Sequence, residues 1–198
     1  MINLNDASYD AKEGTVIFND GVAGIVENLT AAVTKKTKED NENSPEYKLT
    51  FTDANGGTCS SSFWYVEKAT SYSTIDEQIT KQGKVLKHII HAIYGADYQL
   101  PTFQDARGML DGCMKLIREG LASGLKFRIF ANYGTKDSRK KYIQPRSWVP
   151  FMEPMSVDIA STRLKAGDLD GMTRLTEDSL VDTSGPANAD TLVDDEEW

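Results

Sequence analysis

The fold is decided by residues 46–66, which read EYKLTFTDANGGTCSSSFWYV. Tyr47, Leu49 and Phe51 alternate with polar residues, which is the period of a strand with one buried face. Asn55-Gly56-Gly57 then offers the positive φ angles of a tight turn, and Cys59 to Val66 has the composition of a return strand. The stretch therefore predicts an antiparallel hairpin.

Strand patterns also occur before and after this hairpin. Val16 to Val33 is rich in β-formers and holds Gly21 and Gly24, which indicates a pair of strands or one strongly bent strand. After Gly124 the apolar residues Leu125, Phe127 and Ile129 alternate with Lys126, Arg128 and Phe130, so this strand is expected to show two cations and a ring on one face. Tyr142 to Val149 is the next predicted strand, with Tyr142, Gln144, Arg146 and Trp148 on one face.

The middle of the chain has helical periodicity instead. Thr74-Ile75-Asp76-Glu77 has the spacing of a capping box, and apolar residues follow at helical intervals as far as Ile93, before Gly95. A second helix is predicted from Thr102-Phe103-Gln104-Asp105 to about Gly120. Its expected buried residues are Met109, Leu110, Cys113, Met114 and Ile117, and Gly108 and Gly112 would allow close packing.

The formal net charge of −8 is distributed unevenly. Residues 167–198 carry ten acids and one base, which leaves 21 bases and 20 acids in residues 1–166. We therefore divide the chain into a folded domain, 1–166, and an acidic tail, 167–198, expected to be disordered from about residue 176 because it has too few apolar residues to offset its ordering entropy. The tail ends in Asp194, Asp195, Glu196, Glu197 and Trp198, and this tip is the predicted partner-binding segment.

Other sequence features limit the protein class. No apolar run is long enough to span a bilayer and no secretion signal precedes residue 10, so a cytoplasmic protein is expected. Cys59 and Cys113 are too few and too far apart for a disulfide framework, and both are expected to be buried.

Cations and aromatic rings coincide on neighbouring segments of the predicted domain. Single-stranded nucleic acid offers phosphates that attract Lys and Arg and unpaired bases that stack on rings, whereas duplex binding would use only the cations. For any one such residue a solvated charge or a core ring is the more common explanation, but the combination favours a binding site. The predicted DNA-binding residues are Lys35, Lys36, Lys48, Trp64, Lys126, Arg128, Phe130, Tyr133, Lys136, Arg139, Lys140, Lys141, Tyr142, Arg146 and Trp148.

Three strand regions, a helical segment and two more strands form the order of an OB-fold. Residues 45–53, Phe63-Trp64-Tyr65, 89–100 and 146–153 resemble phage-type single-stranded DNA-binding proteins, and the similarity extends over about residues 14–155. The resemblance implies a mainly β protein, an OB-like five-stranded barrel with two helices between strands 3 and 4. It also implies a role in DNA replication, recombination and repair, with single-stranded DNA bound and protected.

The tail is similar in design to those of bacterial and T7-like phage single-strand binders, whose tips usually end in Phe where this chain has Trp198. That likeness implies that the tip recruits replication or recombination proteins, such as a polymerase, helicase or primase, and competes with DNA for the basic groove.

Other functions find less support in the sequence. His88 and His91 could share a metal, but no Cys or carboxylate stands at a ligand spacing, so we interpret them as helix-surface residues. Asp76 and Glu77 suit helix capping better than catalysis, and the glycine pairs lack the spacing of a phosphate-binding loop. No enzyme, cofactor or metal site is expected. Two alternatives remain: a phage structural, assembly or protein-interaction module that does not bind DNA, and an acidic protein that mimics DNA.

Overall fold

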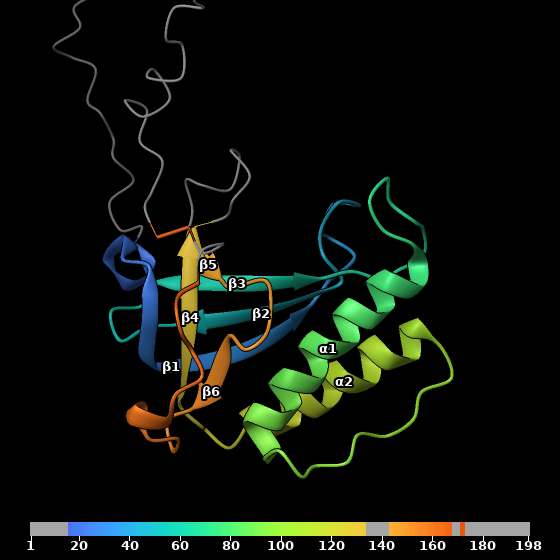
Figure 1. Ribbon diagram of the computed structural model, residues 1–198. Coiled ribbons are helices and arrows are strands. Elements are labelled where there is room, and N and C mark those ends of the chain that lie inside the picture. The colour runs from blue at the N-terminus through green and yellow to red at the C-terminus, as the bar shows by residue number, and fades with distance from the viewer. Residues whose placement is uncertain (1–15, 134–142, 168–170, 173–198) are drawn as a thin grey trace, which may run out of the picture.

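A computed structural model describes residues 16–133, 143–167, 171 and 172. They form a mainly β fold, a six-stranded antiparallel sheet with two α-helices packed beside it (Figure 1). The elements in chain order are the short 3-10 helix Phe18–Gly21, β1 (Gly24–Lys35), β2 (Tyr47–Thr52), β3 (Thr58–Phe63), α1 (Ile75–Tyr94), α2 (Ala106–Leu121), β4 (Phe127–Tyr133), β5 (Ile143–Pro145), β6 (Met152–Pro154) and the 3-10 helix Ile159–Ser161. The predicted mainly β class is confirmed, and both α-helices lie between β3 and β4 as expected. The sheet has six strands where five were predicted, and β5 ends at Pro145, so the strand predicted to continue to Val149 is wrong beyond that residue.

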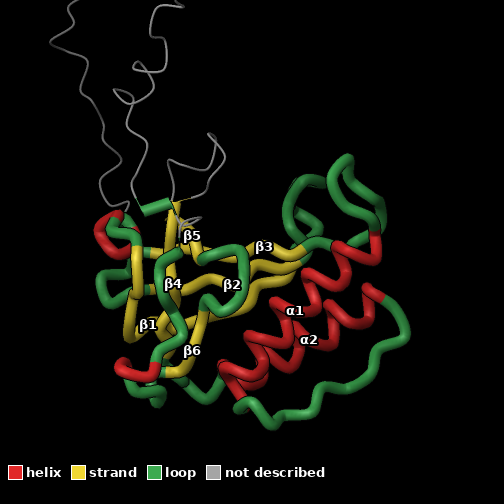
Figure 2. The backbone as a smooth tube through the Cα atoms, viewed as in Figure 1, coloured by secondary structure: helices red, strands yellow, loops and turns green. Residues whose placement is uncertain are grey.

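The strands follow one path through the sheet, β3-β2-β1-β4-β5, and β6 pairs with β4 off this path (Figure 2). Strand β4 therefore has partners along both of its edges: β1 on one side, and β5 and β6 on the other. The two ends of the path, β3 and β5, line a common cavity.

The hairpin of β2 and β3 is confirmed. Tyr47 lies opposite Phe63 and Phe51 opposite Cys59, so the apolar residues of the two strands share one face. Gly56 takes the positive φ of 86° that the turn requires. The Asp53 carboxylate closes the turn, because its Oδ1 accepts a hydrogen bond of 2.8 Å from the amide of Gly57.

The start of the domain differs from the prediction of a long strand pair. Residues Phe18–Gly21 form a 3-10 turn instead, and the amide of Asn19 donates to Asp53 Oδ2 at 2.7 Å, which ties this turn to the β2–β3 hairpin. The bend expected in the first strand is present within β1, where the register with β4 shifts between Val26 and Leu29 and Asn28 has a φ of 60°.

Both helices begin where the sequence predicts. The Thr74 side chain accepts from the amide of Glu77 while the Glu77 carboxylate accepts from the amide of Thr74, so the capping box is complete. Asp105 caps α2 by accepting from the amide of Gly108 at 2.6 Å. Helix α1 packs against α2 and β6, and α2 packs against β1.

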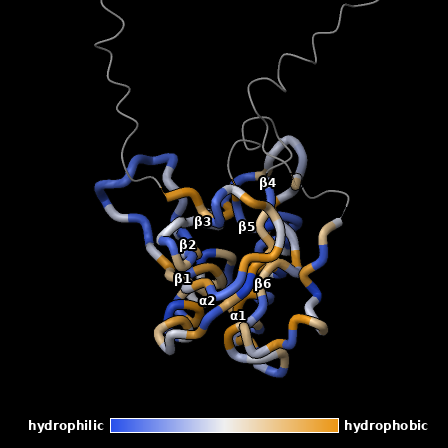
Figure 3. The backbone as a smooth tube through the Cα atoms, turned by 90° about the vertical axis from the view of Figure 1, so that its left-hand side faces the viewer, coloured by the Kyte–Doolittle hydropathy of each residue, from blue (hydrophilic) through white to orange (hydrophobic). Residues whose placement is uncertain are grey.

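The core lies between the helices and the inward face of the sheet. Leu49 and Phe51 from β2 pack in one cluster with Leu86 and Ile90 from α1 and Ile117 from α2. Cys59 and Cys113 belong to the same cluster and are free thiols, as predicted. Phe151 and Met152 are buried in this cluster as well. Figure 3 shows hydrophobic segments near β5 and β6.

The sheet extends past residue 166, the predicted end of the domain. Gly171 forms an antiparallel β-bridge with Tyr133, whose amide donates to the Gly171 carbonyl at 2.8 Å. A side chain at residue 171 would overlap the Tyr133 carbonyl, so this close approach requires glycine.

Candidate nucleic-acid interface

One face of strands β1, β2 and β3 is open and lined by small hydroxyl side chains. In these strands the residues that alternate with the buried ones point outward, and the pairing places Thr30, Thr52 and Thr58 in one row and Ala32, Thr50 and Ser60 in the next. The third row is Thr34, Lys48 and Ser62. We call these residues the hydroxyl face.

Three of the predicted DNA-binding residues gather at one end of the hydroxyl face. Lys48 belongs to its last row, and the amide of Lys36 donates to Glu46 at 2.8 Å, which continues the pairing of β1 with β2 beyond that row. Trp64 directly follows β3, and 51% of its surface is exposed. This end therefore combines two cations with an accessible aromatic ring.

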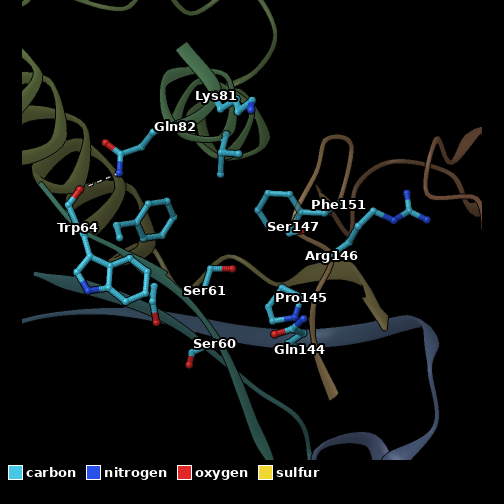
Figure 4. A pocket seen from close by; sticks show the side chains of 13 residues that line it. Ser60, Ser61, Trp64, Lys81, Gln82, Gln144, Pro145, Arg146, Ser147 and Phe151 are labelled. Carbon is cyan, nitrogen blue, oxygen red and sulfur yellow. Dashed lines mark hydrogen bonds between the residues drawn. The ribbon is translucent and has the colours of Figure 1, made fainter. Parts of the chain in front are cut away.

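A cavity of about 440 Å³ opens beside Trp64, between the two end strands of the sheet. Its walls come from β3 and the residue after it (Ser60 to Trp64), from α1 (Lys81, Gln82 and Val85) and from β5 and the residues after it (Gln144 to Ser147), with Phe151 at the back (Figure 4). We call it the seam cavity.

Gln82 holds α1 against this end of β3. Its Nε2 donates a hydrogen bond of 3.0 Å to the backbone carbonyl of Trp64, drawn as a dashed line in Figure 4. The bond fixes the backbone of Trp64 relative to the turn of α1 that carries Gln82 and the preceding residue, Lys81.

Arg146 lies in the wall of the seam cavity but is a buried residue, with only 4% of its surface exposed. Its guanidinium carbon lies 3.8 Å from the centre of the Phe130 ring and 5.4 Å from that of Trp148. Its Nη1 donates to the Pro150 carbonyl at 3.1 Å, and in Figure 4 its side chain extends away from Ser60 and Ser61. Arg146 thus organises the chain after β5, and Trp148 remains 36% exposed beside it.

The prediction that the strand after Gly124 has an exposed basic face is wrong. Every residue of β4 is buried, because the strand is paired on both edges and covered on both faces. Arg128, only 3% exposed, forms ion pairs with Glu27 at 3.2 Å and Glu153 at 3.3 Å. Phe130 is 2% exposed under Arg146, and the Tyr133 hydroxyl donates to the Gly21 carbonyl.

Lys35 faces the opposite side of the sheet from Lys36. Its Nζ lies 3.6 Å from Asp111 of α2 and 5.2 Å from the centre of the Tyr47 ring. Burial raises the pKa of Asp111, but the hydroxyls of Tyr47 and Tyr65, which donate to it, and the charge of Lys35 outweigh this effect and lower its pKa overall. Hydrogen bonding with Tyr47 raises the pKa of Lys35, so this lysine is a charged link between β1 and α2.

Of the remaining predicted residues, the structure describes only Lys126. Lys126 is exposed just before β4. The residues Lys136, Arg139, Lys140, Lys141 and Tyr142, and the tip residues Asp194, Asp195, Glu196, Glu197 and Trp198, lie outside the described residues.

The interpretation of both histidines as helix-surface residues is wrong for His88. Its Nε2 accepts hydrogen bonds of 3.2 Å from the amides of Phe151 and Met152, so the ring is a link between α1 and β6. Burial, with a contribution from the charge of Arg163, lowers the pKa of His88 to about 4. In the described part of the chain, no group of three or more His, Cys, Asp or Glu side chains could hold a metal ion.

Three exposed lysines on α1 are not among the predicted binding residues, namely Lys81, Lys84 and Lys87. Their spacing is visible in the sequence, because residues three apart lie on one side of a helix. Their position beside Trp64 depends on the tertiary contact from Gln82.

Comparison with protein-family models, with curated proteins and with solved structures found no match to this chain. None of the described helices combines the length and the apolar character that crossing a membrane requires.

Proposed function

We propose that this chain binds single-stranded DNA along the hydroxyl face, with the strand anchored at Lys36, Lys48 and Trp64. The observation that carries the proposal is the meeting of two cations and a half-exposed indole at the end of an open polar sheet face, beside the seam cavity. Lysines attract phosphates, and Ser and Thr hydroxyls bond to phosphate and sugar oxygens without reading sequence.

A single strand suits this face better than a duplex does. The Trp64 ring can stack only on a base that is not already stacked in a helix, and base–aromatic stacking is worth about 1 to 3 kcal/mol per base. Because Ser and Thr side chains are short, the sugar–phosphate backbone of DNA can approach this face of the sheet closely.

The order of the elements supports an OB-type barrel as the scaffold. Such a barrel has five strands with a partly open seam, and it binds oligonucleotides over the face of its second and third strands. Here β2 and β3 carry most of the hydroxyl face, and the end strands β3 and β5 approach each other across the seam cavity. Together with the sequence resemblance, this arrangement favours a protein that protects single-stranded DNA during replication, recombination and repair, with the acidic tip as its contact for other proteins.

The first prediction concerns Trp64. Trp64→Ala should weaken binding of the full chain to a fluorescent oligo(dT) by about 1 to 3 kcal/mol, because one stacked base is lost. The dependence on salt should change little, since no cation is removed. Fluorescence anisotropy over a range of salt concentrations measures both quantities.

Tyr72→Ala is the matched control, because Tyr72 is 91% exposed in the loop before α1 and does not belong to the hydroxyl face. It should leave the affinity unchanged. The proposal is contradicted if the wild-type chain does not bind oligo(dT), or if it binds the corresponding duplex equally well.

A further inference from the structure

Helix α1 carries a row of lysines that the hydroxyl face does not include. Lys81, Lys84 and Lys87 are all exposed, on the side of the helix opposite its buried residues Leu86 and Ile89. Spaced three residues apart, they cover about 9 Å along the helix axis. We call them the α1 stripe.

Within the described residues, one acid interacts with the stripe: Glu77 lies one turn before Lys81, and the two charges attract each other. None of its three lysines forms an ion pair there, whereas Lys35, Arg107, Lys115 and Arg128 do. The nearby Glu77 carboxylate is engaged at the start of the helix, where it accepts from Ser73 and from the amide of Thr74. Such a row of like charges on one helix face forms a positive surface that attracts a polyanion.

The stripe begins at the seam cavity. Lys81 lines that cavity together with Trp64, and the hydrogen bond from Gln82 to the Trp64 carbonyl ties this turn of α1 to the backbone at the end of β3 (Figure 4). Lys84 and Lys87 lead away from the cavity along the helix. The stripe therefore starts at the cavity that Trp64 also lines.

We propose that single-stranded DNA passes over the edge of β3 at Trp64 and continues along α1, with its phosphates on Lys81, Lys84 and Lys87. This inference rests on the proposed function and extends its site from the sheet onto the helix. The stripe itself offers charge and no ring, so it binds the backbone of any sequence.

Because the stripe lies beyond Trp64, only a sufficiently long strand can reach it. A short oligonucleotide occupies the anchor at Lys48 and Trp64, and a longer one reaches Lys84 and Lys87 as well. Each lysine that neutralises a phosphate of a single strand contributes about 0.7 to the slope of log affinity against log salt. Removal of two such contacts should lower the slope by about 1.4.

The test compares two double variants of the full chain, Lys84→Gln/Lys87→Gln on the stripe and Lys115→Gln/Arg118→Gln on the exposed side of α2. Both remove two cations from a helix, so their net charges match. Each is titrated with oligo(dT) of about 5 and about 16 nucleotides, the range of sites bound by single OB-type domains. Thermal unfolding of each variant verifies that it folds.

The stripe variant should lose roughly tenfold or more in affinity for the long oligonucleotide at low salt, with the lower slope, and bind the short one as the wild type does. The α2 variant should bind both as the wild type does. Three results would contradict DNA binding by the stripe. They are equal losses of affinity for both oligonucleotides, equal losses in both variants, and an affinity of the stripe variant for the long oligonucleotide that is unchanged or raised. None of them contradicts binding at the anchor site. A wild-type chain that binds neither oligonucleotide overturns the proposed function and the stripe with it.

Discussion

A neutral imidazole joins α1 to β6. Because His88 accepts from two backbone amides, the protonated ring, which has no free lone pair, cannot make these bonds. Arg163 disfavours the cationic ring further, while the charge of Glu153 acts in the opposite direction. The folded state therefore binds the proton less tightly than the unfolded chain does.

This difference predicts a loss of stability in mild acid. The pKa of His88 falls from 6.5 in the unfolded chain to about 4 in the folded one, so its contribution is complete above pH 6.5 and disappears as the pH falls toward 4. The loss amounts to at most about 3 kcal/mol, because one pKa unit corresponds to 1.36 kcal/mol. Urea unfolding of the wild type across this pH range measures it.

His88→Gln should be less stable near neutral pH and show a flatter pH dependence between 6.5 and 4. His91→Gln is the control, because it keeps both amide bonds to His88 and should therefore keep most of the wild-type profile. The carboxylate of Asp111, whose pKa is lowered, acts in a different window, because its contribution is lost only below its ordinary pKa of 3.8. An H88Q profile parallel to that of the wild type would exclude His88 as the origin of the acid sensitivity.

At the scale of elements, α1 and α2 approach each other through glycine. A Cβ at Gly120 would overlap the Ile93 side chain and crowd the Tyr94 ring, whereas a Cβ at Gly83 would lie 3.6 Å from Met109 Sδ, an ordinary contact. The helices can therefore pack at their present distance only if residue 120 lacks a side chain.

Gly120→Ala should destabilise the domain by about 1 to 3 kcal/mol, the usual cost of overpacking, even though Ala favours a helix. Gly83→Ala removes the same backbone freedom without the overlap, so it should be neutral or stabilise by up to about 1 kcal/mol. Chemical denaturation of the two variants gives both values. A G120A variant as stable as G83A would show that α1 and α2 can separate at no cost.

Elements set by local chemistry were predictable from the sequence. The β2–β3 turn depends on Gly56 and Asp53, and the start of α1 on Thr74 and Glu77, so short patterns sufficed for both. The role of β4 could not be predicted in this way. Its alternation is real, but whether Arg128 faces water depends on Glu27 of β1 and Glu153 of β6, which distant parts of the chain bring to it.

The candidate site was predictable to the same extent. Lys36, Lys48 and Trp64 lie on or next to the hairpin, and all three are among the residues predicted from the sequence. Arg146 was selected for its charge, but its burial between two rings depends on the fold of the chain after β5. The α1 stripe was missed because its link to Trp64 is a tertiary contact from Gln82.

At the scale of the whole molecule, the charge is separated along the chain. Lys36, Lys48 and the α1 stripe are cations in a domain whose net charge is +1, whereas residues 167–198 carry a net charge of −9. A polyanion and a tethered acidic segment compete for the same lysines if both can reach them, and screening by salt weakens that competition.

Deletion of residues 176–198 tests this competition. The segment holds Glu177, Asp178, Asp182, Asp190, Asp194, Asp195, Glu196 and Glu197 and no base, so the formal net charge rises from −8 to zero. We expect the affinity for oligo(dT) to rise, most clearly at low salt, because the truncated chain lacks the acids that compete with phosphate. Anisotropy titrations at several salt concentrations measure the change.

Trp198→Ala separates the two roles of the tail, because it removes the aromatic anchor and no side-chain charge. It should leave the affinity for oligo(dT) nearly unchanged while weakening capture of replication or recombination proteins by the immobilised full chain. Removal of the segment leaves intact every described contact of the sheet, including the pairing of Gly171 with Tyr133, so the truncated chain should unfold at the wild-type temperature. A truncation that unfolds the domain or abolishes DNA binding would instead place these residues in the core or in the site itself.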